Sequence, residues 1–456
     1  MSPSHRPARW SVAALALGLV AGLLGCTAPR AERTDRPSVR VEQTQESLRQ
    51  RVAAPAEGPP PAWSVPLRRL DQEVGEIGPV ILVPDSRELR AVDRATGQER
   101  WRHPFTTGYQ YVIAGESIVA ADSDDGGMEV LDAATGVTRW RTAESQDVVV
   151  HEQTVFAREC AGTGDSATCT IVGRDVPSGR QLWERPVDRF ARVSDVTLGA
   201  RTPYAPASGR YVAVRLSTSP RSAAYAPVAP TTGRVGAGRL PNRAWYGFVA
   251  GDLLVTTDND PARGEQRCTV SIATVDAATG DKGWSGVVFS GRKEDGECGK
   301  RLAHHHSGLT LIGAGTRLVA VTADGRPQLV DLGTGRTVWK GAAVGVPIDG
   351  DNQSVLVRGN ADAGGLALLD LSTGVTRWTA PDPLLSGASA SWRSAVTEGL
   401  VAVSAAEDDR PIVLVYEART GRQLGRYPGW LAGAGADWVA VSRTGPDGLA
   451  VDLRAF

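Results

Sequence analysis

The feature that most constrains this chain is a recurring motif, Asp-x-x-Thr-Gly, followed by tryptophan four residues after the glycine. The copies with aspartate, glycine and tryptophan are Asp93, Gly97 and Trp101; Asp132, Gly136 and Trp140; Asp175, Gly179 and Trp183; Asp276, Gly280 and Trp284; Asp331, Gly335 and Trp339; and Asp370, Gly374 and Trp378. Two further copies are degenerate: the one at Gly233 lacks both the aspartate and the tryptophan, and the one at Gly421 has Gly425 in place of the tryptophan. The eight glycines are 39 to 55 residues apart, which is the length of one β-propeller blade.

Each motif position has a physical reason. Aspartate and threonine side chains hydrogen-bond backbone amides within a turn, and glycine adopts the positive φ that such turns need. Tryptophan offers a large flat surface and one N–H, which suits packing between neighbouring blades. Short apolar runs such as Val80–Val83 and Leu89–Val92 precede the motif. The repeating unit is therefore predicted to be strand, turn, strand, motif turn and strand. We interpret the tryptophans as structural residues and not as a ligand site.

The repeated motif resembles the PQQ-like (pyrroloquinoline-quinone-type) repeat of β-propellers and covers Trp63 to Phe456. That superfamily includes BamB-like lipoproteins, quinoprotein dehydrogenases and sensor domains of some bacterial serine/threonine kinases. The resemblance implies an all-β propeller of four-stranded antiparallel blades. Eight blades are expected from the family norm, although a literal count of the units is nine and seven to nine are possible.

The ends of the repeat region complement each other. Trp63–Leu67 resembles a tryptophan strand without a preceding turn, whereas Trp438–Val441 and Leu449–Leu453 are strands without a tryptophan strand after them. We therefore expect the N- and C-terminal strands to share one blade, which removes exposed sheet edges.

The N-terminus is typical of an export signal. Arg6 and Arg9 precede an uncharged apolar stretch that ends in Leu23-Leu24-Gly25-Cys26, which resembles a bacterial lipobox. We expect residues 1–25 to be a lipoprotein signal peptide, residues 26–61 a lipidated cysteine and disordered tether, and residues 62–456 the propeller. The protein would then be anchored at the outer face of the cell membrane through Cys26. The alternative is an ordinary secretory signal with an incidental cysteine.

The remaining cysteines number four, which in an exported protein indicates disulfides. Cys160 and Cys169 flank a polar loop between two β-like stretches, so a bridge across a hairpin is natural. Cys268 and Cys298 then pair by elimination. The competing four-cysteine zinc site lacks any Cys-x-x-Cys spacing.

No catalytic motif emerges from the sequence. The quinoprotein dehydrogenases use adjacent cysteines, which are absent here, and His304–His306 cannot converge on one metal from a strand. The acidic stretches Asp122–Gly127, Asp258–Asp260 and Asp349–Asn352 follow apolar strands and are interpreted as turns. A net charge of −1 argues against a nucleic-acid partner.

We therefore expect a binding scaffold or sensor for an unknown protein or cell-envelope ligand. It would be monomeric and would have no cofactor, no metal and no catalytic activity. The alternative is a quinone- or metal-dependent oxidoreductase of the quinoprotein type.

Overall fold

The fold is described from a computed structural model. It describes residues 57–70, 72–106, 108–122, 127–143, 145–162, 167–189, 191–193, 197–198, 209–217, 223–240, 246–260, 267–292, 310–322, 324–359, 365–381, 394–407, 410–446 and 448–456. The chain divides into two units, Met1–Val52 and Ala53–Phe456, and every described residue belongs to the second. All elements among the described residues are β-strands, and they form nine sheets.

The first three blades are regular four-stranded antiparallel sheets whose strands pair in chain order. Blade 1 consists of β2 (Gly75–Ile77), β3 (Val80–Asp85), β4 (Glu88–Asp93) and β5 (Glu99–Pro104). Blade 2 consists of β6 (Tyr109–Ala114), β7 (Ser117–Asp122), β8 (Met128–Asp132) and β9 (Thr138–Thr142). Blade 3 consists of β10 (Ser145–His151), β11 (Thr154–Ala161), β12 (Thr168–Asp175) and β13 (Gln181–Val187).

Two irregular blades follow. Blade 4 has three strands, β14 (Arg192–Val193), β16 (Val212–Ser217) and β17 (Ala223–Val228). Blade 5 has β18 (Tyr246–Ala250), β19 (Leu253–Asp260), β20 (Arg267–Asp276) and β21 (Lys282–Arg292). Its sheet is extended beyond β18 by β15 (Thr197–Leu198) and β22 (Thr310–Leu311), which pair in parallel.

The next three blades are again regular. Blade 6 consists of β23 (Gly313–Ala314), β24 (Arg317–Val321), β25 (Pro327–Asp331) and β26 (Thr337–Lys340). Blade 7 consists of β27 (Gly345–Gly350), β28 (Ser354–Gly359), β29 (Leu366–Asp370) and β30 (Thr376–Ala380). Blade 8 consists of β31 (Ser394–Val396), β32 (Leu400–Glu407), β33 (Arg410–Glu417) and β34 (Gln423–Pro428).

Blade 9 joins the two ends of the propeller. It consists of β35 (Trp430–Ala434), β36 (Trp438–Gly445), β37 (Gly448–Ala455) and, as its outer strand, β1 (Trp63–Leu67). β1 pairs antiparallel with β37 from Trp63 opposite Leu453 to Leu67 opposite Leu449. The expected sharing of a blade by the two terminal strands is confirmed.

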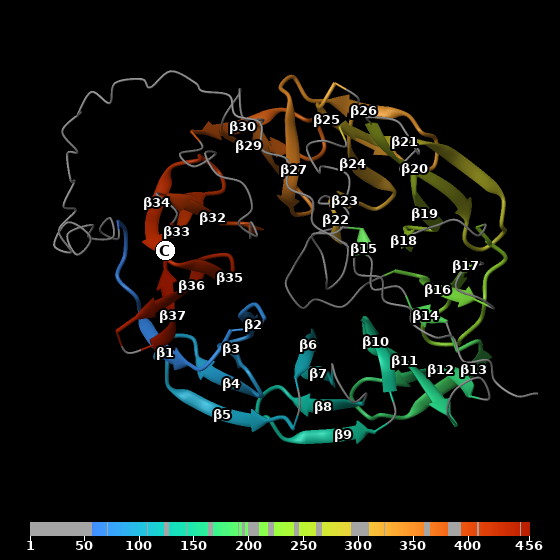
Figure 1. Ribbon diagram of the computed structural model, residues 1–456, viewed down its shortest axis with the longest axis horizontal. Helices are drawn as coiled ribbons and strands as arrows, with labels where there is room; N and C mark the ends of the chain where they lie inside the picture. Colours follow the sequence, from blue (N-terminus) through green and yellow to red (C-terminus); the bar gives the residue numbers. More distant parts are fainter. Residues whose placement is uncertain are drawn as a thin grey trace, which may run out of the picture. The chain divides into compact units, whose positions relative to one another are not determined.

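Apolar residues fill the space between successive blades, because strand side chains alternate between two buried faces. On β3, Leu82 belongs to a cluster with Ile118 and Leu131 of blade 2. Its neighbour Ile81 points the other way and packs with Trp438 of blade 9. Figure 1 shows β2, β6, β10 and β27, each the first strand of its blade, nearest the centre, and β5, β9, β13 and β30, each the fourth, at the periphery. The all-β propeller of antiparallel blades is confirmed.

The expected number of eight blades is wrong, because the described residues form nine sheets. The degenerate unit at Gly233 still makes a sheet, since Val212, Val214 and Val228 are buried against the apolar face of blade 3. Burial of these valines stabilises strand pairing even though the unit has lost its aspartate and its tryptophan. Ahead of β1, Glu57 exchanges backbone hydrogen bonds with Arg426 of blade 8.

Candidate functional site

The intact repeat turns are built around the carboxylate of the aspartate. In blade 1, Asp93 Oδ1 accepts hydrogen bonds of 3.0 Å from the backbone N–H groups of Ala95 and Thr96 and from the Thr96 hydroxyl. Gly97 N donates to Asp93 O at 2.8 Å, and Gly97 has a φ of 70°. Glycine adopts this left-handed conformation without steric cost, which explains why it closes the turn.

In three of these turns the carboxylate also pairs with an arginine seven residues later. The pairs are Asp93–Arg100, Asp132–Arg139 and Asp370–Arg377. The Arg139 guanidinium, together with the Thr135 hydroxyl, lowers the pKa of Asp132 from 3.8 to about 2. This carboxylate is therefore ionised at neutral pH, and it accepts its hydrogen bonds from groups of its own turn. It has no proton to donate as a general acid.

The tryptophan of one blade packs on the turn of the next. Trp101 on β5 lies against Gly136 of blade 2, and its Nε1 donates to the carbonyl oxygen of Ala133 at 3.0 Å. The same ring-on-glycine contact joins Trp63 with Gly97, Trp140 with Gly179, Trp183 with Gly233, Trp284 with Gly335, Trp339 with Gly374 and Trp378 with Gly421. The repeat residues thus hold neighbouring blades together.

Blade 4 makes this junction without a tryptophan. The backbone N–H of Gly238 donates to Ala277 O at 3.2 Å, and that of Ala237 donates to Ala278 O at 3.1 Å. Ala277 directly follows Asp276, so its carbonyl occupies the position that accepts the indole N–H in other turns. A Cβ on Gly236 would overlap the Ala277 oxygen. Glycine therefore allows the backbone itself to replace the missing ring.

Blade 8 lacks the tryptophan for a different reason. In blade 9 the strand outside β37 is β1, from the other end of the propeller, so no repeat turn joins the two strands. In that place Glu57 and Arg426 exchange two backbone hydrogen bonds of 2.9 and 2.8 Å. Gly425, at the tryptophan position, lies against the buried ring of Tyr427.

Among the described residues, blade 4 meets blade 5 with three strands, where the regular blades have four. Elsewhere a fourth strand packs on the next blade, as β34 does on β36. Blade 4 has no fourth strand among the described residues, and its third strand, β17, packs on β19. Leu254 of β19 packs with Tyr225 of β17, and Thr256, two residues later, points to the same face.

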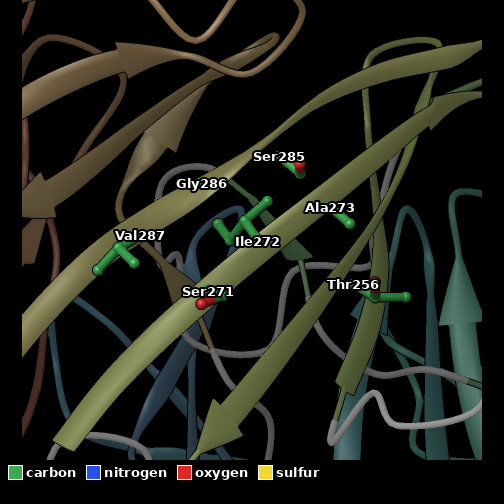
Figure 2. A pocket seen from close by; sticks show the side chains of 7 residues that line it. All are labelled: Thr256, Ser271, Ile272, Ala273, Ser285, Gly286 and Val287. Carbon is green, nitrogen blue, oxygen red and sulfur yellow. The ribbon is translucent and has the colours of Figure 1, made fainter.

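A hollow of about 340 Å³ lies beside Thr256 on this three-stranded surface (Figure 2). The residues that line it are Thr256 on β19, Ser271, Ile272 and Ala273 on β20, and Ser285, Gly286 and Val287 on β21. Three hydroxyl groups and the side chain of Val287, which is 53% exposed, contribute to it. This hollow, hereafter the blade 5 hollow, is the candidate binding surface. The sequence analysis did not predict this hollow. The missing tryptophan after Gly233 was the one sequence feature that pointed to an altered junction between blades 4 and 5.

Of the two expected disulfides, the structure contains the one between Cys160 and Cys169, which are directly opposite each other on β11 and β12. The expected bridge between Cys268 and Cys298 lies outside the residues whose side chains the structure describes. The lipidated Cys26 and the histidines His304–His306 also lie outside the described residues.

Of the acidic stretches expected to form turns, Asp258–Asp260 is instead the end of β19, paired with β20, so that expectation is wrong. In the stretch Asp349–Asn352 the first two residues end β27, and the turn begins at Asp351. Asp351 Oδ1 accepts hydrogen bonds from the backbone N–H groups of Gln353 and Ser354 at 2.8 and 2.6 Å. In the part of the chain that the structure describes, no group of three His, Cys, Asp or Glu side chains could hold a metal ion. No helix among these residues is long and apolar enough to cross a membrane.

A protein-family model and a curated relative match this chain. The model of one protein family, outer membrane protein assembly factor BamB, matches residues 49–265 and 269–443. A serine/threonine-protein kinase, AfsK from Streptomyces griseus, is 27% identical over an alignment that covers 29% of this chain. That alignment spans 18% of the length of the kinase.

Solved structures of other proteins also align with most of this chain. BamB from Moraxella catarrhalis is 13% identical, with a TM-score of 0.43, and the alignment covers 87% of this chain and 100% of that one. A europium-containing methanol dehydrogenase is also 13% identical, with a TM-score of 0.43, over 87% of this chain and 93% of that one.

Proposed function

This chain belongs to the family of the outer membrane protein assembly factor BamB, and from that premise we propose that it is a membrane-anchored propeller scaffold that binds a partner protein without catalysis. The observation that carries the proposal is the family match over residues 49–265 and 269–443, which takes in most of the repeat region. The partner is a protein of the cell envelope, and the scaffold works as a monomer at the outer face of the membrane.

The chemistry of the repeats supports a scaffold over an enzyme. The carboxylates that recur most regularly, such as Asp93 and Asp132, are occupied by turn hydrogen bonds and by arginines. The recurring tryptophans are occupied by contacts between blades. The repeated polar and aromatic groups therefore maintain the ring, and the surface left for a partner is where the repeat is interrupted.

The blade 5 hollow is the surface at which we expect the partner protein. It combines exposed apolar area at Val287 with hydroxyl groups of Thr256 and Ser285, a mixture typical of non-obligate protein interfaces. A photo-crosslinking residue at Val287, in the full chain expressed in its own cells, is expected to capture one defined protein. The same residue at Val137, which is 64% exposed on a repeat turn, is the matched control. Equal capture at both positions would count against the hollow.

Membrane anchoring is supported by the sequence Leu23-Leu24-Gly25-Cys26. The variant Cys26→Ala is expected to leave the propeller folded and to release it from the membrane fraction. Labelling with a radioactive fatty acid tests the lipid directly. Incorporation of the label into Cys26→Ala would contradict the anchor but would leave the binding proposal open to the crosslinking experiment.

The absence of catalysis is tested by supplying what a quinoprotein would need. The purified chain is incubated with pyrroloquinoline quinone, calcium, an alcohol panel and an electron-accepting dye. We expect no dye reduction above the protein-free rate. Calcium-dependent reduction by the wild-type chain would refute the scaffold proposal in favour of the oxidoreductase.

A further inference from the structure

Two arginines converge on the degenerate turn of blade 4. Arg185 follows Trp183 by two residues on β13, and its Nη2 donates to the carbonyl oxygen of Gly233 at 3.1 Å. Arg239 Nη1 donates to the carbonyl oxygens of Gly236 and Gly238 at 2.6 and 2.7 Å. Both guanidinium groups therefore reach the backbone of the same short segment.

Neither arginine has a negative partner within the part of the chain that the structure describes, where each bonds only to backbone carbonyls. The Nε of Arg185 is buried and has no hydrogen-bond partner there. Burial, and then the charge of Arg185, lower the pKa of Arg239, which accords with two positive charges lying close together. A buried donor without a partner is costly, and a bound acceptor removes that cost.

The other repeats serve as an internal comparison. The residue equivalent to Arg185 at the junction of blades 1 and 2 is His103, whose Nδ1 lies 3.1 Å from Gly136 O. There the carboxylate of Glu129 lies 2.9 Å from His103 Nε2. Blade 4 also lacks the repeat aspartate, because Ala229 occupies its position. This one turn has thus lost a carboxylate and gained two guanidinium groups.

We propose that Arg185 and Arg239 form a binding site for an oxyanion of the size of phosphate. Planar guanidinium groups bind such oxygens with two parallel hydrogen bonds, and an anion would offset the repulsion between the two charges. It would also satisfy the buried Nε of Arg185. The phosphate is either free in solution or part of a phospholipid headgroup, and the chemistry of recognition is the same for both.

The test measures binding of radiolabelled inorganic phosphate to the full chain by equilibrium dialysis at constant ionic strength. Wild type is compared with R185Q/R239Q. The control R141Q/R422Q removes the same charge from arginines whose side chains are 78% and 69% exposed. We expect affinity to fall at least about tenfold in R185Q/R239Q and to stay unchanged in the control. Circular dichroism verifies folding, and R239Q alone replaces the double variant if that variant unfolds.

A second arm separates the two sources of phosphate. Co-sedimentation with vesicles containing phosphatidylglycerol is compared with vesicles of phosphatidylcholine alone. If wild type binds one of the two probes and R185Q/R239Q binds it more weakly, the site is supported. The probe that binds then shows whether the ligand is free phosphate or a phospholipid headgroup. Equal binding by wild type and R185Q/R239Q, or no binding of either probe by wild type at millimolar phosphate, overturns the proposal.

Discussion

The indole Nε1 of Trp101 lies 3.0 Å from the carbonyl oxygen of Ala133, 32 residues further along the chain and in the next blade. The ring packs on Gly136 of the same turn and is 8% exposed. One side chain therefore couples two sheets by packing and by a hydrogen bond at once. Because most blades carry this contact, it is the recurring element that turns separate sheets into one propeller.

We predict that Trp101→Ala destabilises the propeller by about 3–5 kcal/mol, because it removes a large buried ring and leaves the Ala133 carbonyl unpaired. Trp430→Ala is the matched control, since Trp430 is 39% exposed and its truncation should cost less than that of Trp101, which is 8% exposed. Urea unfolding measures both. Similar midpoints for the two variants would mean that Trp101 does not join the blades.

The close approach at blade 4 predicts a sharp difference between two glycines. Gly236→Ala should strongly destabilise the chain, because the added Cβ overlaps the backbone oxygen of Ala277, which cannot move aside easily. Gly333→Ala should be tolerated, since its nearest neighbour, Asp331 Oδ1, would lie at 3.4 Å. Thermal unfolding of the two variants compares them. A higher melting temperature for Gly236→Ala than for Gly333→Ala would contradict the backbone contact.

Closure of the ring predicts that deleting residues 62–69 harms the whole propeller. The deletion removes β1, the strand that pairs with the outer edge of β37. β37 would then expose an unpaired edge that favours aggregation. Deleting residues 27–56 is the control and spares Glu57, which bonds to Arg426. We expect a lower urea midpoint and aggregation only for the first deletion. Equal midpoints would show that β1 does not close the ring in solution.

The repeat turns predict a dependence of stability on pH. The pKa of Asp132 is about 2 in the folded chain and 3.8 when unperturbed. Its contribution to stability is therefore complete above about pH 4 and is lost as the pH falls through 2. Asp132→Asn should be less stable than wild type at pH 7, and the difference should shrink between pH 4 and pH 2. Urea unfolding across this range measures it, with Glu116→Gln as the control outside the turns.

Much of the architecture is readable from the sequence, because each repeat carries its own signature. The aspartate, threonine and glycine of a turn interact within five residues, as at Asp93 to Gly97. Local chemistry of this kind identifies the blades. The strands at Trp63 and Leu449 are each missing their usual neighbours, which predicts that these two strands belong to the same blade. The disulfide between Cys160 and Cys169 also joins residues of a single hairpin.

Other features depend on contacts between residues that are far apart in the sequence. The sequence shows that blade 4 lacks a tryptophan, but not that Gly238 bonds to Ala277 in its place. It shows eight motifs and a split unit, but whether the degenerate unit forms a sheet depends on burial of Val212 and Val228 against blade 3. The blade 5 hollow and the convergence of Arg185 with Arg239 arise in the same way. The hollow lies on blade 5, next to the blade that has three strands among the described residues. The two arginines meet at the turn of that same blade, where Ala229 stands in place of the repeat aspartate.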